Sequence, residues 1–148
     1  MNEILLKYWI LTTGFLAVKM WSNSMIQVVS RFKYKAFLNE EDAKEFGSML
    51  KAELVPVSEE HPLVQRASLC WRNDLENIPL FLIIALGYVM VGGNTNMGVA
   101  YFVVYCVCRA LHTFFYLNRI QPWRTVVYEI GSVTTVAILI HSIWQAFQ

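Results

Sequence analysis

Charged residues are scarce in this chain of 148 residues: Asp, Glu, Lys and Arg make up 16% of it, against about 25% in a typical soluble domain. The 12 basic and 11 acidic residues leave a net charge of +1, which excludes the basic field of a nucleic-acid-binding module. Three cysteines are too few for the disulfide scaffold of a small secreted protein. Apolar residues, in contrast, make up 56% of the chain. These figures predict a single transmembrane domain over residues 1–148.

The apolar residues gather in four stretches, each long enough to cross a bilayer as a helix. A helix rises about 1.5 Å per residue, so about 20 residues span a hydrocarbon core of about 30 Å. Helices satisfy their own backbone hydrogen bonds, whereas four strands could not close a barrel. The sequence therefore predicts an all-α, integral membrane four-helix bundle, with helices over about 4–31, 69–91, 97–118 and 122–147.

The connections between these helices differ in length and charge. Residues 32–68 form a long polar segment, which we expect to be a loop, whereas Gly92 and Gly93 mark a short uncharged turn. Basic residues gather on the side of the long segment, and Lys7 marks the other side. Because basic segments stay in the cytoplasm, we expect the long loop there and both termini on the opposite side. The basic residues on the expected cytoplasmic side are Arg31, Lys33, Lys35, Lys44, Lys51, Arg66, Arg119 and Arg124.

Ionisable residues within the apolar stretches are informative because each costs about 2.5–3.5 kcal/mol at the centre of a membrane helix. Lys19 lies in the middle of the first stretch, which favours a retained helix over a cleaved signal. We expect Lys19 to reach the membrane surface or to pair with Glu129 of the last helix. For Arg109 we expect a structural role, such as pairing with Asp74.

Polar side chains recur at helical spacing near the cytoplasmic ends of three helices, so that each helix carries a polar stripe. Three stripes at one depth predict a wet polar pocket between the helices. Arginine binds carboxylates bidentately and Glu76 can hold an ammonium group, so the pocket suits an anionic, amino-acid-like ligand. An amphiphilic second substrate could reach it from the lipid. The stripes comprise Arg72, Asn73 and Glu76; Arg109, His112, Thr113 and Tyr116; and Arg124, Thr125, Tyr128 and Glu129.

Other chemistries find little support in the sequence. The histidines and cysteines are scattered, which predicts no metal site. Cys106 and Cys108 are two residues apart on a helix and point to different faces, unlike a Cys-x-x-Cys redox pair. No phosphate-binding loop surrounds Gly92 and Gly93.

Four short segments carry a resemblance to a known family: Lys35–Phe37 with Asn39–Ala43, Arg72–Ile78, Arg109–Tyr116 and Pro122–Thr125. They resemble the signatures of the membrane-associated eicosanoid and glutathione metabolism (MAPEG) family, in its branch of microsomal glutathione transferases and microsomal prostaglandin E synthase. The resemblance implies a homotrimer of four-helix subunits with glutathione bound between neighbouring subunits.

The resemblance also implies residue roles. Arg124 matches an arginine near the glutathione sulfur, and Thr125 stands where the prostaglandin synthase has a serine. Asp42 matches a loop aspartate proposed to act in isomerase chemistry. The implied catalytic residues are Arg124, Thr125 and Asp42, and the implied glutathione-binding residues are Arg31, Arg72, Asn73, Glu76, His112, Tyr116, Arg124, Thr125 and Tyr128.

The sequence departs from the family pattern at three places. Ser68-Leu69-Cys70-Trp71 stands where this branch has Arg-Ala-His, so a basic rim before the second-helix signature is missing. Thr125 keeps the hydroxyl of a serine but adds a methyl group. Pro79 comes one residue earlier than the proline of the family.

The resemblance, together with the polar stripes, implies a glutathione-dependent membrane enzyme that conjugates the glutathione thiolate to lipophilic electrophiles and reduces lipid hydroperoxides. A free thiol is mostly protonated at neutral pH, and Arg124 at a helix N-terminus favours the nucleophilic thiolate by charge and by dipole. Isomerisation of a prostaglandin endoperoxide is an open alternative, as are a non-enzymatic lipid-binding protein and a structural bundle. We expect the endoplasmic reticulum membrane in a eukaryote and the inner membrane in a bacterium.

Overall fold

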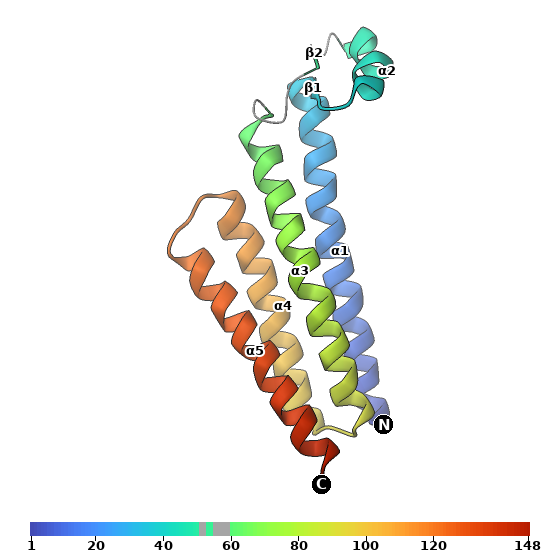
Figure 1. Ribbon diagram of the computed structural model, residues 1–148, viewed down its shortest axis with the longest axis vertical. Helices are drawn as coiled ribbons and strands as arrows, with labels where there is room; N and C mark the ends of the chain where they lie inside the picture. The colour runs from blue at the N-terminus through green and yellow to red at the C-terminus, as the bar shows by residue number, and fades with distance from the viewer. Residues whose placement is uncertain (51–52, 55–59) are drawn as a thin grey trace.

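A computed structural model describes residues 1–50, 53–54 and 60–148, and in this part of the chain four long helices form an up-and-down bundle (Figure 1). All four are long and apolar enough to cross a membrane. The predicted all-α membrane bundle is therefore confirmed, and both termini lie at the same end of it. The helices are α1 (Glu3–Tyr34), α3 (Pro62–Met90), α4 (Thr95–Leu117) and α5 (Trp123–Ala146).

The helices form a ring in which α1 packs on α3, α3 on α5, α5 on α4 and α4 on α1, while α3 and α4 also meet across the centre. Aromatic side chains fill the middle: the ring of Phe81 stacks on that of Tyr105 with centroids 3.6 Å apart. Between α1 and α4, Gly98 permits a close approach, because a Cβ there would lie 2.6 Å from Cδ1 of the buried Leu5. The apolar faces of the helices thus give one continuous core.

Asn2 fastens the start of α1 to the turn between α3 and α4. Its side-chain oxygen caps α1 by accepting from the backbone N–H of Leu5 at 3.1 Å. Its amide nitrogen donates to the carbonyl oxygen of Gly93 at 2.9 Å and to the hydroxyl of Thr95 at 2.8 Å. The predicted turn is present, and Gly92 in it has a φ of 78°, which a residue without a Cβ adopts without strain.

The expected start of the second membrane helix at residue 69 is wrong, because α3 already begins at Pro62. His61 caps this start, its Nδ1 accepting from the backbone N–H of Leu63 at 3.2 Å. Proline suits the first helical position because it has no N–H to leave unpaired. At the other side of the connection, α1 continues to Tyr34 and ends at Lys35, which has a left-handed φ of 53°. The connection is therefore shorter than 32–68.

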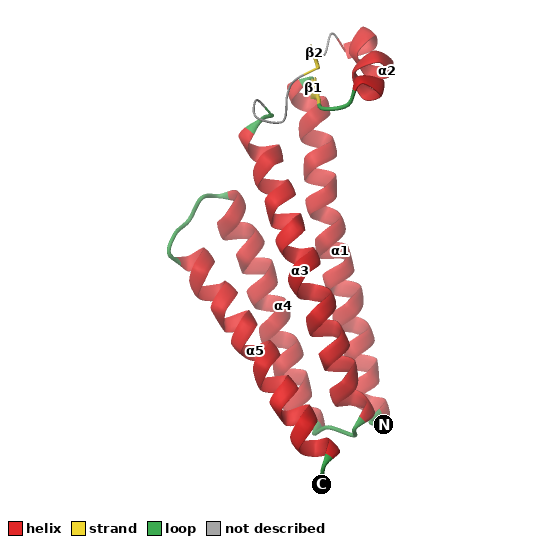
Figure 2. Cartoon of the chain, viewed as in Figure 1, coloured by secondary structure: helices red, strands yellow, loops and turns green. Residues whose placement is uncertain are grey.

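The connection is also not the plain loop that we expected. It contains helix α2 (Glu40–Leu50) and a short parallel pair of strands, β1 (Ala36–Phe37) and β2 (Glu53–Leu54), shown in Figure 2. Three acidic residues, Glu40, Glu41 and Asp42, occupy the first turn of α2, where they complement the helix dipole. Phe37 is buried there, in edge-on contact with Phe32 of α1 at 5.5 Å between centroids. The predicted basic residue Lys51 lies outside the described residues.

Candidate polar site between three helices

A polar cavity of about 210 Å³ lies between α3, α4 and α5. The side chains around it are an amide, an imidazole, two phenols, a guanidinium and a hydroxyl. Helical spacing explains how α4 and α5 each contribute two or more of them, since residues three or four apart share a helix face. The lining residues are Asn73, His112, Tyr116, Arg124, Thr125 and Tyr128, all of them among the residues that the sequence resemblance implies.

A second hollow of about 330 Å³ adjoins this polar pocket and shares Tyr116 and Arg124 with it. It brings in two cationic residues that sequence analysis placed in connections, Arg66 and Arg119. Arg66 was missed as a lining residue because the start of α3 was set too late. Leu69 also lines this hollow, at the rim where the family pattern has basic residues.

Arg124 lies in the first turn of α5, where the partial positive charge of the helix N-terminus adds to its own. Its guanidinium lies over the ring of Tyr116, 4.7 Å from the centroid. Gln121 supports it: with the amide oriented to satisfy both neighbours, its oxygen accepts from Arg124 Nε at 3.0 Å. The amide nitrogen then donates to the hydroxyl of Thr125 at 3.2 Å. Sequence reasoning missed Gln121, although its place just before Pro122 marks the start of α5.

His112 is the most deeply buried side chain of the pocket lining. Its ring contacts those of Tyr116 and Tyr128, with centroids 5.5 and 5.9 Å away. Its Nδ1 has no hydrogen-bond partner among the described residues. Because buried polar atoms are nearly always paired, such an atom fits a site that a polar ligand or water completes.

Arg109 lies directly behind the pocket, and 2% of it is exposed. Its Nη1 donates to the side-chain oxygen of Asn73 at 3.0 Å. Its guanidinium is 5.2 Å from the ring centroid of Tyr105 and 5.6 Å from that of Tyr128. The expected pairing of Arg109 with Asp74 is therefore wrong: Arg109 instead supports two residues of the pocket.

Asp74 pairs with Lys19 of α1, so the expected pairing of Lys19 with Glu129 is also wrong. Asn23, one turn further along α1, donates to the same carboxylate at 2.7 Å. The physical reason is orientation. Asp74 faces the interior of the bundle and is fully buried, whereas Glu129 is exposed and borders a cavity on the outside of α4 and α5.

Arg72 and Glu76 do share a face of α3, and the Arg72 Nε lies 3.4 Å from a Glu76 carboxylate oxygen. Both side chains are exposed, at 77% and 59%, and neither lines the polar pocket. They stand beside Asn73 on the surface of the bundle. Within one chain, these two predicted ligand contacts therefore remain outside the cavity.

Two further predicted residues lie at the end of the bundle. Arg31, near the end of α1, pairs through its Nε with the buried Glu60 at 2.8 Å. Asp42, in α2, accepts from the side-chain amide of Asn39 at 3.2 Å. Figure 1 shows α2 beyond the end of α1 and away from the start of α5. A single chain does not bring Arg31 or Asp42 to the polar pocket.

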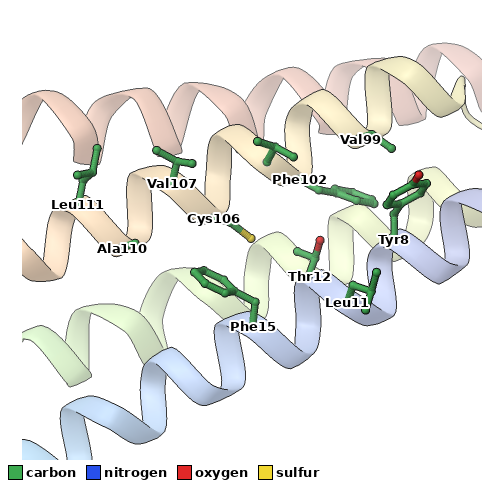
Figure 3. Close-up of a pocket in the computed structure, with 11 residues that line it drawn as sticks. Tyr8, Leu11, Thr12, Phe15, Val99, Phe102, Cys106, Val107, Ala110 and Leu111 are labelled. Carbon is green, nitrogen blue, oxygen red and sulfur yellow. The ribbon is translucent and has the colours of Figure 1, made fainter.

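A larger cavity, of about 470 Å³, lies between α1 and α4, and its lining is almost entirely apolar (Figure 3). Phe15 and Phe102 project into it from the two helices, together with the thiol of Cys106. It lies on the face of α4 opposite to the polar pocket, as their places in the helical repeat require. The described residues contain no group of three His, Cys, Asp or Glu side chains that could hold a metal ion.

The fold and the polar pocket together define a four-helix membrane protein with a polar pocket between three of its helices. Residues 9–144 match the MAPEG family, and the chain belongs to that family, which confirms the predicted resemblance. It is 29% identical to prostaglandin E synthase from Bos taurus over 147 residues, 99% of this chain and 92% of that protein. The human prostaglandin E synthase is also 29% identical over 147 residues, 99% of this chain and 93% of that protein. Microsomal glutathione S-transferase 1 from Rattus norvegicus is 33% identical over 139 residues, 93% of this chain and 87% of that protein.

Proposed function

We propose that this protein is a glutathione-dependent membrane enzyme that activates the thiolate for conjugation to lipophilic electrophiles and for reduction of lipid hydroperoxides. The observation that carries the proposal is the polar pocket, where six side chains from three helices meet at the end of the bundle. Relatives named glutathione S-transferase and prostaglandin E synthase, matched over nearly the whole chain, support it.

The residues of the pocket fit glutathione chemically. The tripeptide carries two carboxylates, an ammonium group and a thiol. Arg124 in the pocket and Arg66 and Arg119 in the adjoining hollow offer guanidinium groups to the carboxylates. The unpaired Nδ1 of His112 provides a further polar contact. Bound there, glutathione would supply a sulfur nucleophile.

The chain's own contribution to the chemistry is electrostatic and positional. Arg124, at the N-terminus of α5, stabilises negative charge at the mouth of the pocket. Gln121 and Tyr116 hold the guanidinium from two sides, which limits its motion. The hydroxyl of Thr125 stands beside it as a hydrogen-bond donor. Because lipid surrounds the helices, apolar substrates reach this end of the bundle without crossing water.

We propose a homotrimer in which the polar pocket is completed by a neighbouring subunit. Arg72 and Glu76 are exposed beside Asn73, where a second copy of the chain would enclose them together with the pocket. Arg31, near the end of α1, pairs with Glu60 within one chain and would have to reach the completed pocket of a neighbour. In this assembly the long connection between α1 and α3, predicted as residues 32–68, lies in the cytoplasm, and the membrane is the endoplasmic reticulum in a eukaryotic cell or the inner membrane in a bacterium.

Isomerisation of a prostaglandin endoperoxide is the second candidate, because seven of the relatives, 28–29% identical, are prostaglandin E synthases. Thr125 and Tyr128 in the pocket would provide hydroxyl groups for that reaction. A part for Asp42 requires a contact that a single chain does not make. The polar lining, with Arg124 in it, argues against a purely lipid-binding or structural protein.

The decisive test is binding of glutathione to the purified protein in detergent, measured by calorimetry, with turnover of a chlorinated nitroaromatic. We expect the wild type to bind, and Arg124→Ala to lose turnover about 100-fold or more, as for removal of one transition-state donor. Lys44→Ala removes an exposed cation of α2 and serves as the control, with turnover unchanged. A wild type that binds no glutathione would overturn the proposal.

Product analysis then separates the two candidate reactions. The wild-type protein is supplied with glutathione and either a prostaglandin endoperoxide or the nitroaromatic. Formation of the conjugate without isomerised prostaglandin supports the transferase, and the reverse supports the isomerase. Thr125→Val, which removes the hydroxyl at nearly constant volume, is expected to impair isomerisation more than conjugation.

A further inference from the structure

Three charged side chains from three different helices are buried together behind the polar pocket. Lys19 of α1 is 8% exposed, Asp74 of α3 is fully buried and Arg109 of α4 is 2% exposed. Each is in a membrane-spanning helix, where an isolated charge costs several kcal/mol. We call these three residues the buried charge cluster.

The charges within this cluster do not balance. Asp74 pairs with Lys19 and accepts a further hydrogen bond from Asn23, both at Oδ2, and its Oδ1 has no hydrogen-bond partner among the described residues. Arg109 pairs with no carboxylate of the described residues, and its Nε has no hydrogen-bond partner among them. Two cations and one anion leave a net charge of +1. A buried charge without a counter-charge is strongly unfavourable, so the cluster calls for an anion nearby.

The cluster is connected to the polar pocket through Arg109. This guanidinium donates to Asn73, which lines the pocket, and lies over the ring of Tyr128, which also lines it. His112 follows Arg109 by one turn of α4 and lines the same cavity. The positive charge therefore stands directly behind the wall of the pocket.

We propose that the buried charge cluster sets how strongly the polar pocket holds an anionic ligand, with Lys19 and Asp74 acting as positioning residues of opposite sign. Lys19 strengthens the hold and Asp74 weakens it, although neither lines the pocket. In this protein the anionic ligand is glutathione, so the inference rests on the proposed function and adds two residues that the family signature does not assign to the ligand.

The physical basis is the low dielectric of the bundle interior. One unit charge at roughly 10 Å, in a medium of effective dielectric about 20, changes the affinity for an anion by about tenfold. Lipid around the helices weakens the screening that water and salt provide at a protein surface. The affinity for the anionic ligand therefore depends on the net charge of the cluster rather than on the presence of any one side chain.

Three variants separate this electrostatic role from a structural one. Lys19→Met lowers the cluster charge to 0, and glutathione should bind about tenfold more weakly. Asp74→Asn raises the charge to +2, and glutathione should bind more tightly than to the wild type. Lys19→Met combined with Asp74→Asn returns the charge to +1, and binding should return to within about threefold of the wild type. Lys7→Met, which removes an exposed cation near the N-terminus of the same helix, is the matched control.

Binding is measured by calorimetry, and the thiolate form of bound glutathione by its ultraviolet absorbance across a pH series. In the proteins whose cluster charge is +1 or +2, the thiolate of bound glutathione should form at lower pH than in Lys19→Met, whose cluster charge is 0. The double variant keeps the test decisive if Asp74→Asn does not fold.

The charged and titratable groups around the pocket are Lys19 of α1; Arg66, Cys70, Asp74 and Glu76 of α3; Arg109, His112 and Tyr116 of α4; Arg119 of the connection; and Arg124 and Tyr128 of α5.

Equal binding to Lys19→Met and to the double variant would overturn the inference, because their net charges differ while both lack the lysine. Loss of binding in all three variants, with folding intact, would assign the cluster a structural role and would also overturn it. A wild type that binds no glutathione is a separate outcome, which overturns the proposed function itself.

Discussion

The two faces of α4 border cavities of opposite character. Toward α3 and α5 the polar pocket measures about 210 Å³ and is lined by ring, amide, hydroxyl and guanidinium groups. Toward α1 the apolar cavity measures about 470 Å³ and is lined by side chains such as Phe15 and Val107 (Figure 3). The lining of the larger cavity thus contains fewer polar and ionisable side chains than that of the smaller one. In a membrane protein an apolar surface hollow is ordinary, since lipid tails are as apolar as leucine, whereas a polar hollow is costly and indicates a function.

The difference extends to what holds each side together. Between α1 and α4, packing depends on shape: Leu5 fits against Gly98 because Gly98 has no Cβ. Behind the pocket, charge controls the packing: Asp74 of α3 pairs with Lys19 of α1, and Arg109 of α4 is buried without a carboxylate partner among the described residues. The apolar side should therefore respond to changes in volume and the polar side to changes in charge.

The largest effect on stability is expected from Asp74→Ala. The substitution leaves Lys19 and Arg109 buried without an anion, and removing one partner of a buried ion pair typically destabilises by about 3–5 kcal/mol. Unfolding in detergent, followed by circular dichroism, should show it. Asp42→Ala in α2 is the control and should change stability by less than about 0.5 kcal/mol. Equal stability of the two variants would mean that charge does not decide the packing of this side.

A smaller effect is expected from Gly98→Ala on the α1 side. The added Cβ meets the fully buried Leu5, and such overpacking typically costs about 1–3 kcal/mol. Gly14→Ala in α1 is the matched control: a Cβ there meets nothing within 4 Å, and alanine favours the helix by up to about 1 kcal/mol. Opposite shifts of the melting temperature are therefore expected. If both Gly98→Ala and Gly14→Ala are destabilised, the glycines contribute to stability by a factor other than the space they leave for a neighbouring side chain.

The sequence predicted the four membrane helices because their apolar stretches are long, but it misjudged the connection. Gln65 and Arg66 read as loop residues, although they belong to a helix that continues beyond its apolar part. The signal for its true start was present in Pro62 after a capping His61. Likewise, Asn39 followed by three acidic residues marks the start of α2.

For the site, the sequence placed six residues that the structure brings to one pocket, because helical spacing and family signatures agree on them. It could not choose the partner of Lys19. Asp74 and Glu129 are both carboxylates within apolar stretches, and which one faces the interior depends on the rotation of each helix in the bundle. The positions of Arg31 and Asp42 depend on the packing of the connection, which apolar periodicity does not describe.

The last prediction concerns the apolar cavity: a substitution there should leave the Michaelis constant for glutathione nearly unchanged. Val107→Phe adds volume to the α4 wall of that cavity, at a side chain 50% exposed, on the face away from His112 and Arg109. Because no charge moves and the polar wall of α4 keeps its contacts, the Michaelis constant for glutathione should change less than about twofold. Thiolate conjugation assays with wild type and variant measure this. A tenfold loss would place the apolar cavity within the same functional site and would end the distinction between the two faces. An unchanged Michaelis constant for glutathione with a raised one for the lipophilic substrate would instead assign the apolar cavity to the second substrate. Each face of α4 would then bind a different substrate.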